Sequence, residues 1–234
     1  MGEIKLMKGN EALAEAMIRE GCDAYFGYPI TPQSEVLEYL SIDAHKRTGM
    51  VVLQSESEVS AINMVYGAAA AGKRVMTTSS SPGMSLMQEG ISYIASAELP
   101  CVLANVMRGG PGLGTIQPSQ GDYFQSVKGG GHGDYHMIVL APSSVQEMVN
   151  YVGLGFELAE KYRTPVMLLA DGAIGQMMEK VELPDQKPRK TVFPDWATTG
   201  KIAGKPRRYI TSLNIKPEEM EKINHILQNK YAEI

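Results

Sequence analysis

The chain has 234 residues, of which 44% are hydrophobic and 21% are charged, which is typical of a folded globular protein. That length allows one large domain, or one domain with an extension. The sequence has no apolar run of about 18 residues, so no membrane span is expected. The first eight residues, M-G-E-I-K-L-M-K, lack the apolar core of a signal peptide, and a cytoplasmic location is therefore expected.

Cysteine count and charge distribution exclude further classes. Cys22 and Cys101 are the only cysteines, which argues against a disulfide framework and against an iron–sulfur cluster held by this chain alone. Residues 180–234 hold 11 of the 22 Lys and Arg but only 7 of the 26 acidic residues. A basic extension of this kind can bind an acidic partner. It lacks the interleaved aromatic residues of a nucleic-acid surface, so nucleic-acid binding is not expected.

The first 175 residues alternate apolar, strand-like runs with amphipathic, helix-like segments. Such alternation predicts a doubly wound α/β domain, with a mostly parallel sheet and helices on both faces. Asn10 is a plausible N-cap for the first helix, and Gly21 and Gly72 are plausible helix ends. The predicted helices span 9–21, 32–44, 56–71, 83–97 and 143–162, and the predicted strands span 23–26, 50–54, 74–78, 100–107, 137–140 and 165–170.

The C-terminal part of the chain departs from this alternation. Residues 183–208 contain four prolines, two glycines and the only tryptophan without any hydrophobic period, which predicts an extended linker that wraps or leaves the domain. One amphipathic helix is predicted at 217–231. A helix after a long linker suggests docking on another subunit, or a chain that continues further in its full-length form.

Residues 27–32, G-Y-P-I-T-P, join the first predicted strand to the next predicted helix. Two prolines fix φ at two positions and disfavour a helix at the residues before them, which holds Thr31 at the apex of a stiff turn. In open α/β sheets, ligands bind beyond the carboxyl ends of the strands, so this turn is a candidate binding site. The alternative is that Thr31 is only an N-cap, with Pro32 at the first helical position.

Further candidates follow the next two strands. Glu56 and Glu58 open an alanine-rich helix, where the helix dipole favours carboxylates, so a purely stabilising role is one explanation. The other is that a carboxylate in an apolar crevice hydrogen-bonds a ring nitrogen of a ligand. After the third strand, residues 79–84, S-S-S-P-G-M, form a small-residue loop suited to the close approach of a flat ligand.

Residues 108–122, R-G-G-P-G-L-G-T-I-Q-P-S-Q-G-D, contain few good helix formers and predict a long loop, and loops of this length in compact domains are usually functional. Arg108 stands at its base, where a guanidinium can meet a carboxylate with two parallel hydrogen bonds. The alternative is a surface arginine paired with a neighbour.

Three other motifs do not support the function that their spacing suggests. Residues 67–73 copy most of a phosphate-binding loop, but Arg74 replaces the required Ser or Thr and the alanines place the motif inside a helix. The glycines at 110–114 lack a following helix. His132 and His136 have the spacing of helical metal ligands, but the glycines around them argue against a helix, so a role in lining the active site is the better interpretation.

Taken together, G-Y-P-I-T-P-Q-S-E at 27–35, S-E-S-E-V-S-A-I-N at 55–63, S-S-P-G-M-S-L-M-Q-E-G at 80–90 and the loop at 108–122 resemble a known set. They resemble the α subunit of the thiamine-dependent 2-oxoacid:ferredoxin oxidoreductases, in its pyrimidine-binding domain. The match covers essentially residues 1–175. The loop is most similar to that of the branched-chain (2-oxoisovalerate, or 3-methyl-2-oxobutanoate) members, whereas 2-oxoglutarate members typically carry a G-P-S-T-G version.

The resemblance implies a role for each matching residue. Glu58 would hydrogen-bond N1′ of the thiamine diphosphate aminopyrimidine and so promote deprotonation of the thiazolium carbon, with Glu56 fitting the register less well. Arg108 would bind the carboxylate of the 2-oxoacid, and Thr31 would touch that carboxylate or the cofactor-bound substrate. The implied cofactor-binding residues are Tyr28, Pro29, Ile30, Thr31, Glu58, Ser81 and Pro82, and the implied substrate-binding residues are Thr31, Arg108, Gly109 and Gly110.

Departures from the family pattern indicate which functions belong to partners. The chain has no G-D-G with a downstream Asn to hold Mg²⁺ and diphosphate, although Asp171 begins a D-G-A-I-G segment near the right place. We therefore expect no metal site here, and expect a β subunit to supply diphosphate binding and Mg²⁺. The β subunit would also supply electron transfer, iron–sulfur clusters would lie on partner subunits, and ferredoxin-like and γ subunits are further expected partners. The assembly would be a homodimer or a hetero-oligomer. The implied domains are a pyrimidine-binding domain at 1–180, then a linker and helix at 181–234 leading towards a second domain that a fragment or a reduced version would lack.

The implied activity is oxidative decarboxylation of a branched-chain 2-oxoacid with coenzyme A, with electrons passing to ferredoxin, and the chain alone is expected to be inactive. One alternative is a non-catalytic assembly or regulatory module, which the joint presence of Thr31, Glu58 and Arg108 argues against. Another is half of a thiamine-dependent non-oxidative decarboxylase, which the R-G-G-P loop disfavours.

Overall fold

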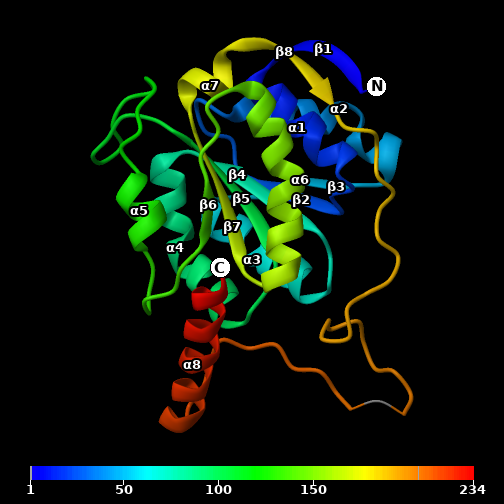
Figure 1. Cartoon of the computed structure of the whole chain (residues 1–234), viewed down its shortest axis with the longest axis vertical. Helices are drawn as coiled ribbons and strands as arrows, with labels where there is room; N and C mark the ends of the chain where they lie inside the picture. The colour runs from blue at the N-terminus through cyan, green and yellow to red at the C-terminus, as the bar shows by residue number, and fades with distance from the viewer. Residues whose placement is uncertain (1, 205) are drawn as a thin grey trace.

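Six parallel strands form the centre of the molecule (Figure 1). The computed structural model describes residues 2–204 and 206–234. The strand order is β3-β2-β4-β5-β7-β6, and every neighbouring pair is parallel. The strands are β2 (Ala24–Gly27), β3 (Val51–Gln54), β4 (Val75–Ser79), β5 (Cys101–Met107), β6 (Ile138–Leu140) and β7 (Pro165–Asp171).

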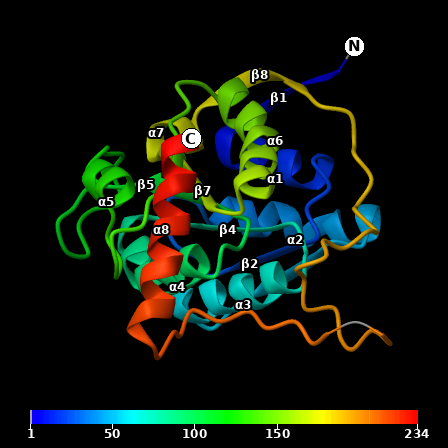
Figure 2. The same cartoon turned by 60° about the horizontal axis from the view of Figure 1, so that its bottom comes forward.

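Helices cover both faces of this sheet, as Figure 2 shows. One face packs under α1 (Gly9–Arg19), α2 (Ser34–Thr48) and α6 (Val145–Tyr162). The other packs under α3 (Glu58–Ala70) and α4 (Ser81–Ser96). Two separate hydrophobic cores result, one on each face. The predicted doubly wound α/β fold is confirmed.

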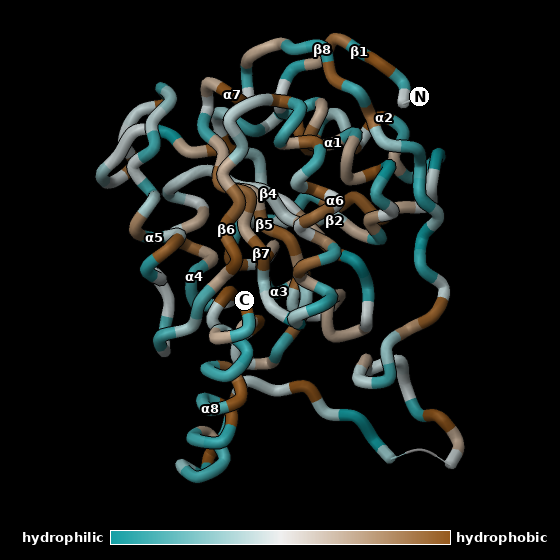
Figure 3. Tube along the Cα trace, viewed as in Figure 1, coloured by the Kyte–Doolittle hydropathy of each residue, from teal (hydrophilic) through white to brown (hydrophobic). Residues whose placement is uncertain are grey.

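The strands are apolar along their whole length because both of their faces are covered. All seven residues of β5 and all seven of β7 are buried, and the tube coloured by hydropathy is brown through the centre of the sheet (Figure 3). Burial of one large apolar side chain contributes about 1.5–3 kcal/mol, so these two central strands are a major source of stability.

The chain reverses its direction of travel across the sheet between β2 and β4. From β2 it moves outward to β3, and from β4 it moves the opposite way to β5 and on to β6 at the far edge, after which β7 fills the place between β5 and β6. Because the carboxyl ends of parallel strands meet at one edge, the segments after β2 and β4 diverge there, at the switch point where open α/β sheets bind ligands. The fold therefore places the turn after β2 and the loop after β4 beside each other.

Two helix caps considered from the sequence differ in the structure. The first helix begins at Gly9 after an N-cap at Lys8, so Asn10 is not the cap. Asn10 is instead fully buried and donates from Nδ2 to the Pro32 carbonyl at 2.6 Å. The second helix begins at Ser34 with Gln33 as N-cap, so Thr31 does not cap it and Pro32 is not its first residue. Tertiary contacts to the turn at 28–32 decide both positions.

Four short elements were not predicted from the sequence. An antiparallel ribbon of β1 (Glu3–Lys8) and β8 (Met178–Leu183) pairs segments about 175 residues apart in sequence, so no local pattern indicates it. The helices α5 (Tyr123–Lys128) and α7 (Gly172–Gln176) are single turns, too short to show helical periodicity. The β8 strand lies across the domain boundary proposed at residue 180, and that boundary stays a prediction.

The segment after β8 follows the surface of the domain before reaching α8 (Pro217–Glu233). Arg189 Nε pairs with Asp23 Oδ1 at 2.7 Å, and Trp196 stacks against the Arg163 guanidinium at 4.8 Å. The α8 helix docks through Lys230, whose Nζ pairs with Glu98 at 2.7 Å. This is the wrapping linker and final helix that the sequence predicted. No helix in the described ranges has the length and apolarity that crossing a bilayer requires.

Candidate functional site

The turn at 28–32 is anchored at its Pro32 end and exposed at most of its other residues. Tyr28, Pro29 and Thr31 are exposed, whereas Pro32 is buried and its carbonyl accepts hydrogen bonds from Asn10 Nδ2 and, at 3.0 Å, from Gln176 Nε2. The Thr31–Pro32 peptide is cis. Thr31 is therefore exposed at the carboxyl edge of the sheet, on the turn that was predicted after the first strand.

Below the turn lies a buried hydrogen-bonded chain that joins three elements. Gln33 is fully buried, and its Oε1 accepts from Thr78 Oγ1 in β4 at 2.5 Å. Thr78 Oγ1 in turn lies 2.7 Å from the Tyr25 hydroxyl in β2. Because buried polar groups stabilise only when they are paired, this chain ties the start of α2 to two strands at the switch point.

Glu58 is the first residue of α3, and the residue is only 5% exposed. Ser57 caps the helix, with its Oγ accepting from the Ser60 amide at 3.2 Å, so Glu58 is not needed as the cap. Glu56 lies outside the helix and is exposed. Glu58 Oε1 lies 2.6 Å from where a Cβ on Gly83 would stand, so the carboxylate is directed towards the first turns of α4.

Arg108 is 7% exposed and connects the turn at 28–32 to the loop at 108–122. Its Nη1 donates to the Thr31 carbonyl and its Nη2 to the Leu113 carbonyl, each at 3.0 Å. Its Nε is buried and has no hydrogen-bond partner among the described residues. The alternative of a surface arginine paired with a neighbour is wrong about the position, because Arg108 is buried, although its guanidinium does bond two neighbouring carbonyls.

Ser81 fixes the backbone from which Arg108 projects. Its Oγ accepts from the Arg108 amide at 3.0 Å and donates to Asp122 Oδ2 at 2.5 Å. Asn105 Nδ2 donates to the same Asp122 oxygen at 2.9 Å, and Asn105 Oδ1 accepts from the Ser81 amide at 3.0 Å. Neither Asn105 nor Asp122 was predicted as a site residue from the sequence. The signal for Asn105 is a single polar residue within the apolar strand C-V-L-A-N-V-M.

The loop at 109–122 folds back on itself. The Gly109 amide donates to the Gln117 carbonyl at 2.9 Å, and the Thr115 amide donates to the Gly109 carbonyl at 2.8 Å. The fold presents Leu113 and Ile116 to solvent, with 79% and 59% of their surfaces exposed. The loop is thus ordered by its own backbone and is apolar on its outer side.

The predicted site residues gather at this one edge, with two separate groups of contacts. Arg108 bonds the Thr31 carbonyl and the Ser81 hydroxyl group directly. The Glu58 carboxylate lies beside Gly83 of α4 and makes no hydrogen bond to Thr31 or Arg108. The remaining predicted residues lie on the same turn, helix start and loop: Tyr28, Pro29, Ile30, Pro82, Gly109 and Gly110.

The other motifs lie elsewhere. His132 and His136 are exposed and precede β6, so they lie beside α8, where the His136 ring packs edge-on against Tyr231 at 5.1 Å. The structure therefore places both histidines beside α8 and not with the other predicted site residues, and a role in lining the active site stays a prediction. Asp171 caps α7, its Oδ1 accepting from the Ala173 and Ile174 amides at 2.9 and 3.0 Å. Within residues 2–204 and 206–234, no three His, Cys, Asp or Glu side chains cluster as metal ligands would.

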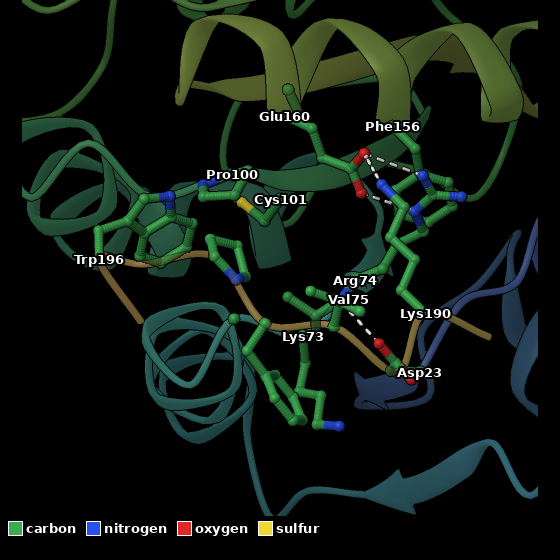
Figure 4. Close-up of a pocket in the computed structure, with 15 residues that line it drawn as sticks. Asp23, Lys73, Arg74, Val75, Pro100, Cys101, Phe156, Glu160, Lys190 and Trp196 are labelled. Carbon is green, nitrogen blue, oxygen red and sulfur yellow. Dashed lines mark hydrogen bonds and ion pairs between the residues drawn. The ribbon is translucent and has the colours of Figure 1, made fainter. Parts of the chain in front are cut away.

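A second pocket, of about 310 Å³, lies at the amino ends of β4 and β5 under the segment at 190–196 (Figure 4). Its charged groups already satisfy one another. Arg74 donates from Nε and Nη2 to the two oxygens of Glu160 at 2.8 and 3.0 Å, and Lys190 pairs with the same carboxylate. The carboxyl edge differs because it holds buried polar atoms without partners, and such atoms are expected where a ligand completes the site.

A parallel α/β domain with unpartnered polar groups at its switch point defines a cofactor-binding domain. The sequence model of the family described as pyruvate flavodoxin/ferredoxin oxidoreductase, thiamine diphosphate-binding, matches residues 15–230. The chain belongs to this family, which confirms the resemblance drawn from the four motifs.

Individual relatives differ in their named substrates. The chain is 52% identical over 230 residues to a ketoisovalerate oxidoreductase subunit VorB from Methanothermobacter thermautotrophicus, covering 98% of this chain and 65% of that protein. It is 43% identical over 204 residues to a 2-oxoglutarate synthase subunit KorA from Methanocaldococcus jannaschii, covering 82% of this chain and 55% of the relative. The chain thus spans just under two thirds of the length of the VorB relative and just over half of the length of the KorA relative.

A solved relative has the same fold. The structure of a 2-oxoglutarate:ferredoxin oxidoreductase from Magnetococcus marinus, with 2-oxoglutarate, coenzyme A and succinyl-CoA bound, superposes with a TM-score of 0.83 at 32% identity. The superposition covers 98% of this chain and 44% of that one.

Proposed function

We propose that this chain is part of a thiamine diphosphate-dependent 2-oxoacid:ferredoxin oxidoreductase that decarboxylates a branched-chain 2-oxoacid oxidatively, forming acyl-CoA, CO₂ and reduced ferredoxin. The observation that carries the proposal is the buried Arg108 guanidinium, with an unpartnered Nε, at the same sheet edge as the buried Glu58 carboxylate. The identity of 52% to a ketoisovalerate oxidoreductase subunit supports the branched-chain substrate.

The residues at this edge fit the pyrimidine half of thiamine diphosphate. Within the described chain the Glu58 carboxylate has no hydrogen-bond partner, although its residue is buried. The residue is 5% exposed and its carboxylate is free to accept a hydrogen bond, and a protonated aminopyrimidine N1′ is a donor of the right chemistry. When bound, thiamine diphosphate supplies a thiazolium carbon that adds to the 2-oxo carbon and accepts the electron pair released with CO₂. Glu58 is the residue that would hold the proton at N1′.

Arg108 would bind the carboxylate of the 2-oxoacid. A guanidinium has five N–H donors, and only two of them bond carbonyls here, at Thr31 and Leu113. The rest can face a carboxylate with two parallel hydrogen bonds. The exposed Thr31 side chain stands beside this cation and would contact the same substrate, while Gly109 and Gly110 let it approach the backbone. Tyr28, Pro29, Ile30, Ser81 and Pro82 would line the cofactor side.

Exposed apolar side chains near the carboxyl edge of the sheet favour contact with a partner subunit. Several large apolar side chains near it are mostly exposed: Leu86, Leu113, Ile116, Tyr123 and Phe124. Exposed apolar side chains of this size around an incomplete site are consistent with a protein interface. The partner would be a β subunit that holds the diphosphate and Mg²⁺, in an assembly whose ferredoxin-like and γ subunits carry iron–sulfur clusters. Residues 181–234 would lead from the pyrimidine-binding domain at 1–180 to a further domain.

The first test is a mild affinity purification of this chain from its native cells, with an absorbance spectrum and a thiamine assay. We expect a brown complex that contains thiamine diphosphate and a cysteine-rich partner, and that 2-oxoisovalerate bleaches in the presence of coenzyme A. A colourless protein without thiamine would refute the proposal. Thiamine without ferredoxin-linked reduction would instead favour a non-oxidative decarboxylase.

The Glu58→Gln variant tests the chemistry within that complex. We expect it to lose nearly all turnover while thiamine diphosphate still binds weakly, because the amide keeps the shape of the side chain but cannot take up the charge that faces N1′. The measurement is ferredoxin reduction together with cofactor content. Glu56→Gln is the matched control, since Glu56 is exposed outside the helix and should leave turnover unchanged. Normal turnover in Glu58→Gln would remove this residue from the mechanism.

A further inference from the structure

We propose that Ser79 is a positioning residue that donates its hydroxyl hydrogen to Glu58 Oε1 and so orients this carboxylate. The inference rests on the proposed function, because it concerns the carboxylate assigned to the cofactor. Sequence analysis placed Ser79 only in a small-residue loop, and Ser79 is in fact the last residue of β4.

The position of Ser79 comes from the packing of α4 against β4. Ser79 is 0% exposed, and its Oγ has no hydrogen-bond partner among the described residues. A Cβ built on Gly83 would lie 2.1 Å from Ser79 Oγ and 2.6 Å from Glu58 Oε1. The hydroxyl and the carboxylate oxygen therefore converge on one point, which only a residue without a side chain leaves empty.

An unpaired hydroxyl in this place is unfavourable unless it has a use. A buried donor without a partner loses its hydrogen bonds to water and gains none in return. The carboxylate oxygen that converges on the same point is also without a hydrogen bond, and it is a strong acceptor. The proposed hydrogen bond requires both side chains to rotate towards the point at which they converge, and it would leave the other carboxylate oxygen for the ligand.

The neighbouring hydroxyl groups are arranged differently. Thr78 faces the opposite side of the sheet, where it bonds Gln33 and lies against Tyr25. Ser80 is also fully buried and unpartnered, but its hydroxyl is not among the three atoms nearest to a Cβ built on Gly83. It is therefore a matched control of the same residue type and burial at the next position of the chain.

The test uses the assembled complex, stripped of cofactor and reloaded with thiamine diphosphate. The rate at which the thiazolium C2 proton exchanges with deuterium is measured by NMR after acid quench, and cofactor affinity is measured separately. We expect Ser79→Ala to slow exchange about tenfold with a nearly unchanged affinity, since a hydrogen bond to a charged group is typically worth at least that factor. Ser79→Thr, which keeps the hydroxyl, should restore the rate, and Ser80→Ala should match the wild type.

A second readout does not depend on the reaction. Without cofactor, Ser79→Ala should melt at the same temperature as the wild type or higher, because it removes an unpaired buried hydroxyl. With cofactor, its gain in melting temperature should be smaller than that of the wild type. A hydroxyl with a merely structural role would instead lower the melting temperature in both states.

Three outcomes separate this proposal from the function on which it rests. If the wild-type complex neither binds thiamine diphosphate nor exchanges its C2 proton, the proposed function fails. If it does both and Ser79→Ala exchanges at the wild-type rate, the function stands and the Ser79 proposal is overturned. If Ser79→Ala does not assemble, a structure of the loaded wild-type complex decides, with a distance between Ser79 Oγ and Glu58 Oε1 of about 3 Å supporting the proposal and one above about 4 Å refuting it.

Discussion

Replacing Arg108 with lysine tests whether the fork of this side chain, and not only its charge, binds the substrate. In the structure the two terminal nitrogens of Arg108 reach two different carbonyl oxygens, those of Thr31 and Leu113, each at 3.0 Å. A lysine has a single nitrogen at the end of its stem and cannot span both. Arg108→Lys therefore keeps the charge but separates the turn from the loop and removes parallel bonding to a carboxylate.

The expected magnitude follows from the number of bonds lost. Losing one hydrogen bond that involves a charged group costs about 1.5–3 kcal/mol. At about 1.4 kcal/mol for each factor of ten, kcat/KM for the 2-oxoacid should fall by about 10- to 150-fold. Arg108 would hold the carboxylate of the bound substrate, and this group leaves as CO₂ when the reaction proceeds. The interaction therefore belongs mainly to substrate binding, and most of the loss should appear as a higher KM.

The assay is reduction of ferredoxin by the assembled complex at varied 2-oxoacid concentration. Arg163→Lys is the matched control, because Arg163 is a half-buried arginine that stacks on Trp196 at the other edge of the sheet. It should leave kcat and KM unchanged. A kcat/KM for Arg108→Lys within about twofold of the wild type would refute the bidentate assignment, since that difference is smaller than one hydrogen bond.

Three further predictions concern stability and reactivity. Burial alone would raise the pKa of Glu15, but hydrogen bonds from two arginines outweigh it and hold the pKa below its usual value of 4.5. Glu15→Gln should therefore lower the free energy of unfolding by about 3 kcal/mol at pH 7. The difference from the wild type, measured by urea titration, should shrink as pH falls below 4.5, through the lowered folded-state pKa. Burial raises the pKa of the Cys22 and Cys101 thiols to about 12, so neither should react with a thiol reagent at pH 8 until the chain is unfolded in denaturant. Gly83→Ala should destabilise the chain by about 1–3 kcal/mol and abolish stabilisation by thiamine diphosphate, since its Cβ would overlap Ser79 and Glu58. The control is Gly67→Ala, at a position in open space on α3, which should stabilise the chain by up to about 1 kcal/mol in the same melting experiments.

Each of these has an outcome that contradicts it. A stability difference for Glu15→Gln that is constant from pH 7 to pH 3 would show that the carboxylate has no lowered pKa in the folded state. Rapid labelling of either thiol in the native protein would show that its strand end opens. An unchanged melting temperature for Gly83→Ala would mean that the side chains around this position move apart at little cost.

Most of the fold could be predicted because its signal is local. An apolar run such as residues 101–107 can be covered on both faces only inside a parallel sheet, and the alternation with helices sets the class of fold. The ribbon of β1 and β8 could not be predicted in this way, because its pairing depends on segments at distant positions of the chain. Asn10 shows the same limit on a smaller scale, since the local pattern of a cap was overridden by its buried contact to Pro32.

The candidate site divides in the same way. The sequence by itself determined which chemical groups follow which strands: Thr31 after β2, Glu58 at the start of α3 and Arg108 after β5. Tertiary structure alone decided how they meet. It joined Arg108 to the Thr31 carbonyl, placed Asp122 and Asn105 under Ser81, moved the two histidines to the opposite edge, and brought Ser79 to Glu58 across Gly83. The physical reason is that hydrophobic periodicity fixes each segment's type and buried face, whereas hydrogen bonds between segments depend on strand order and helix packing, which no single segment encodes.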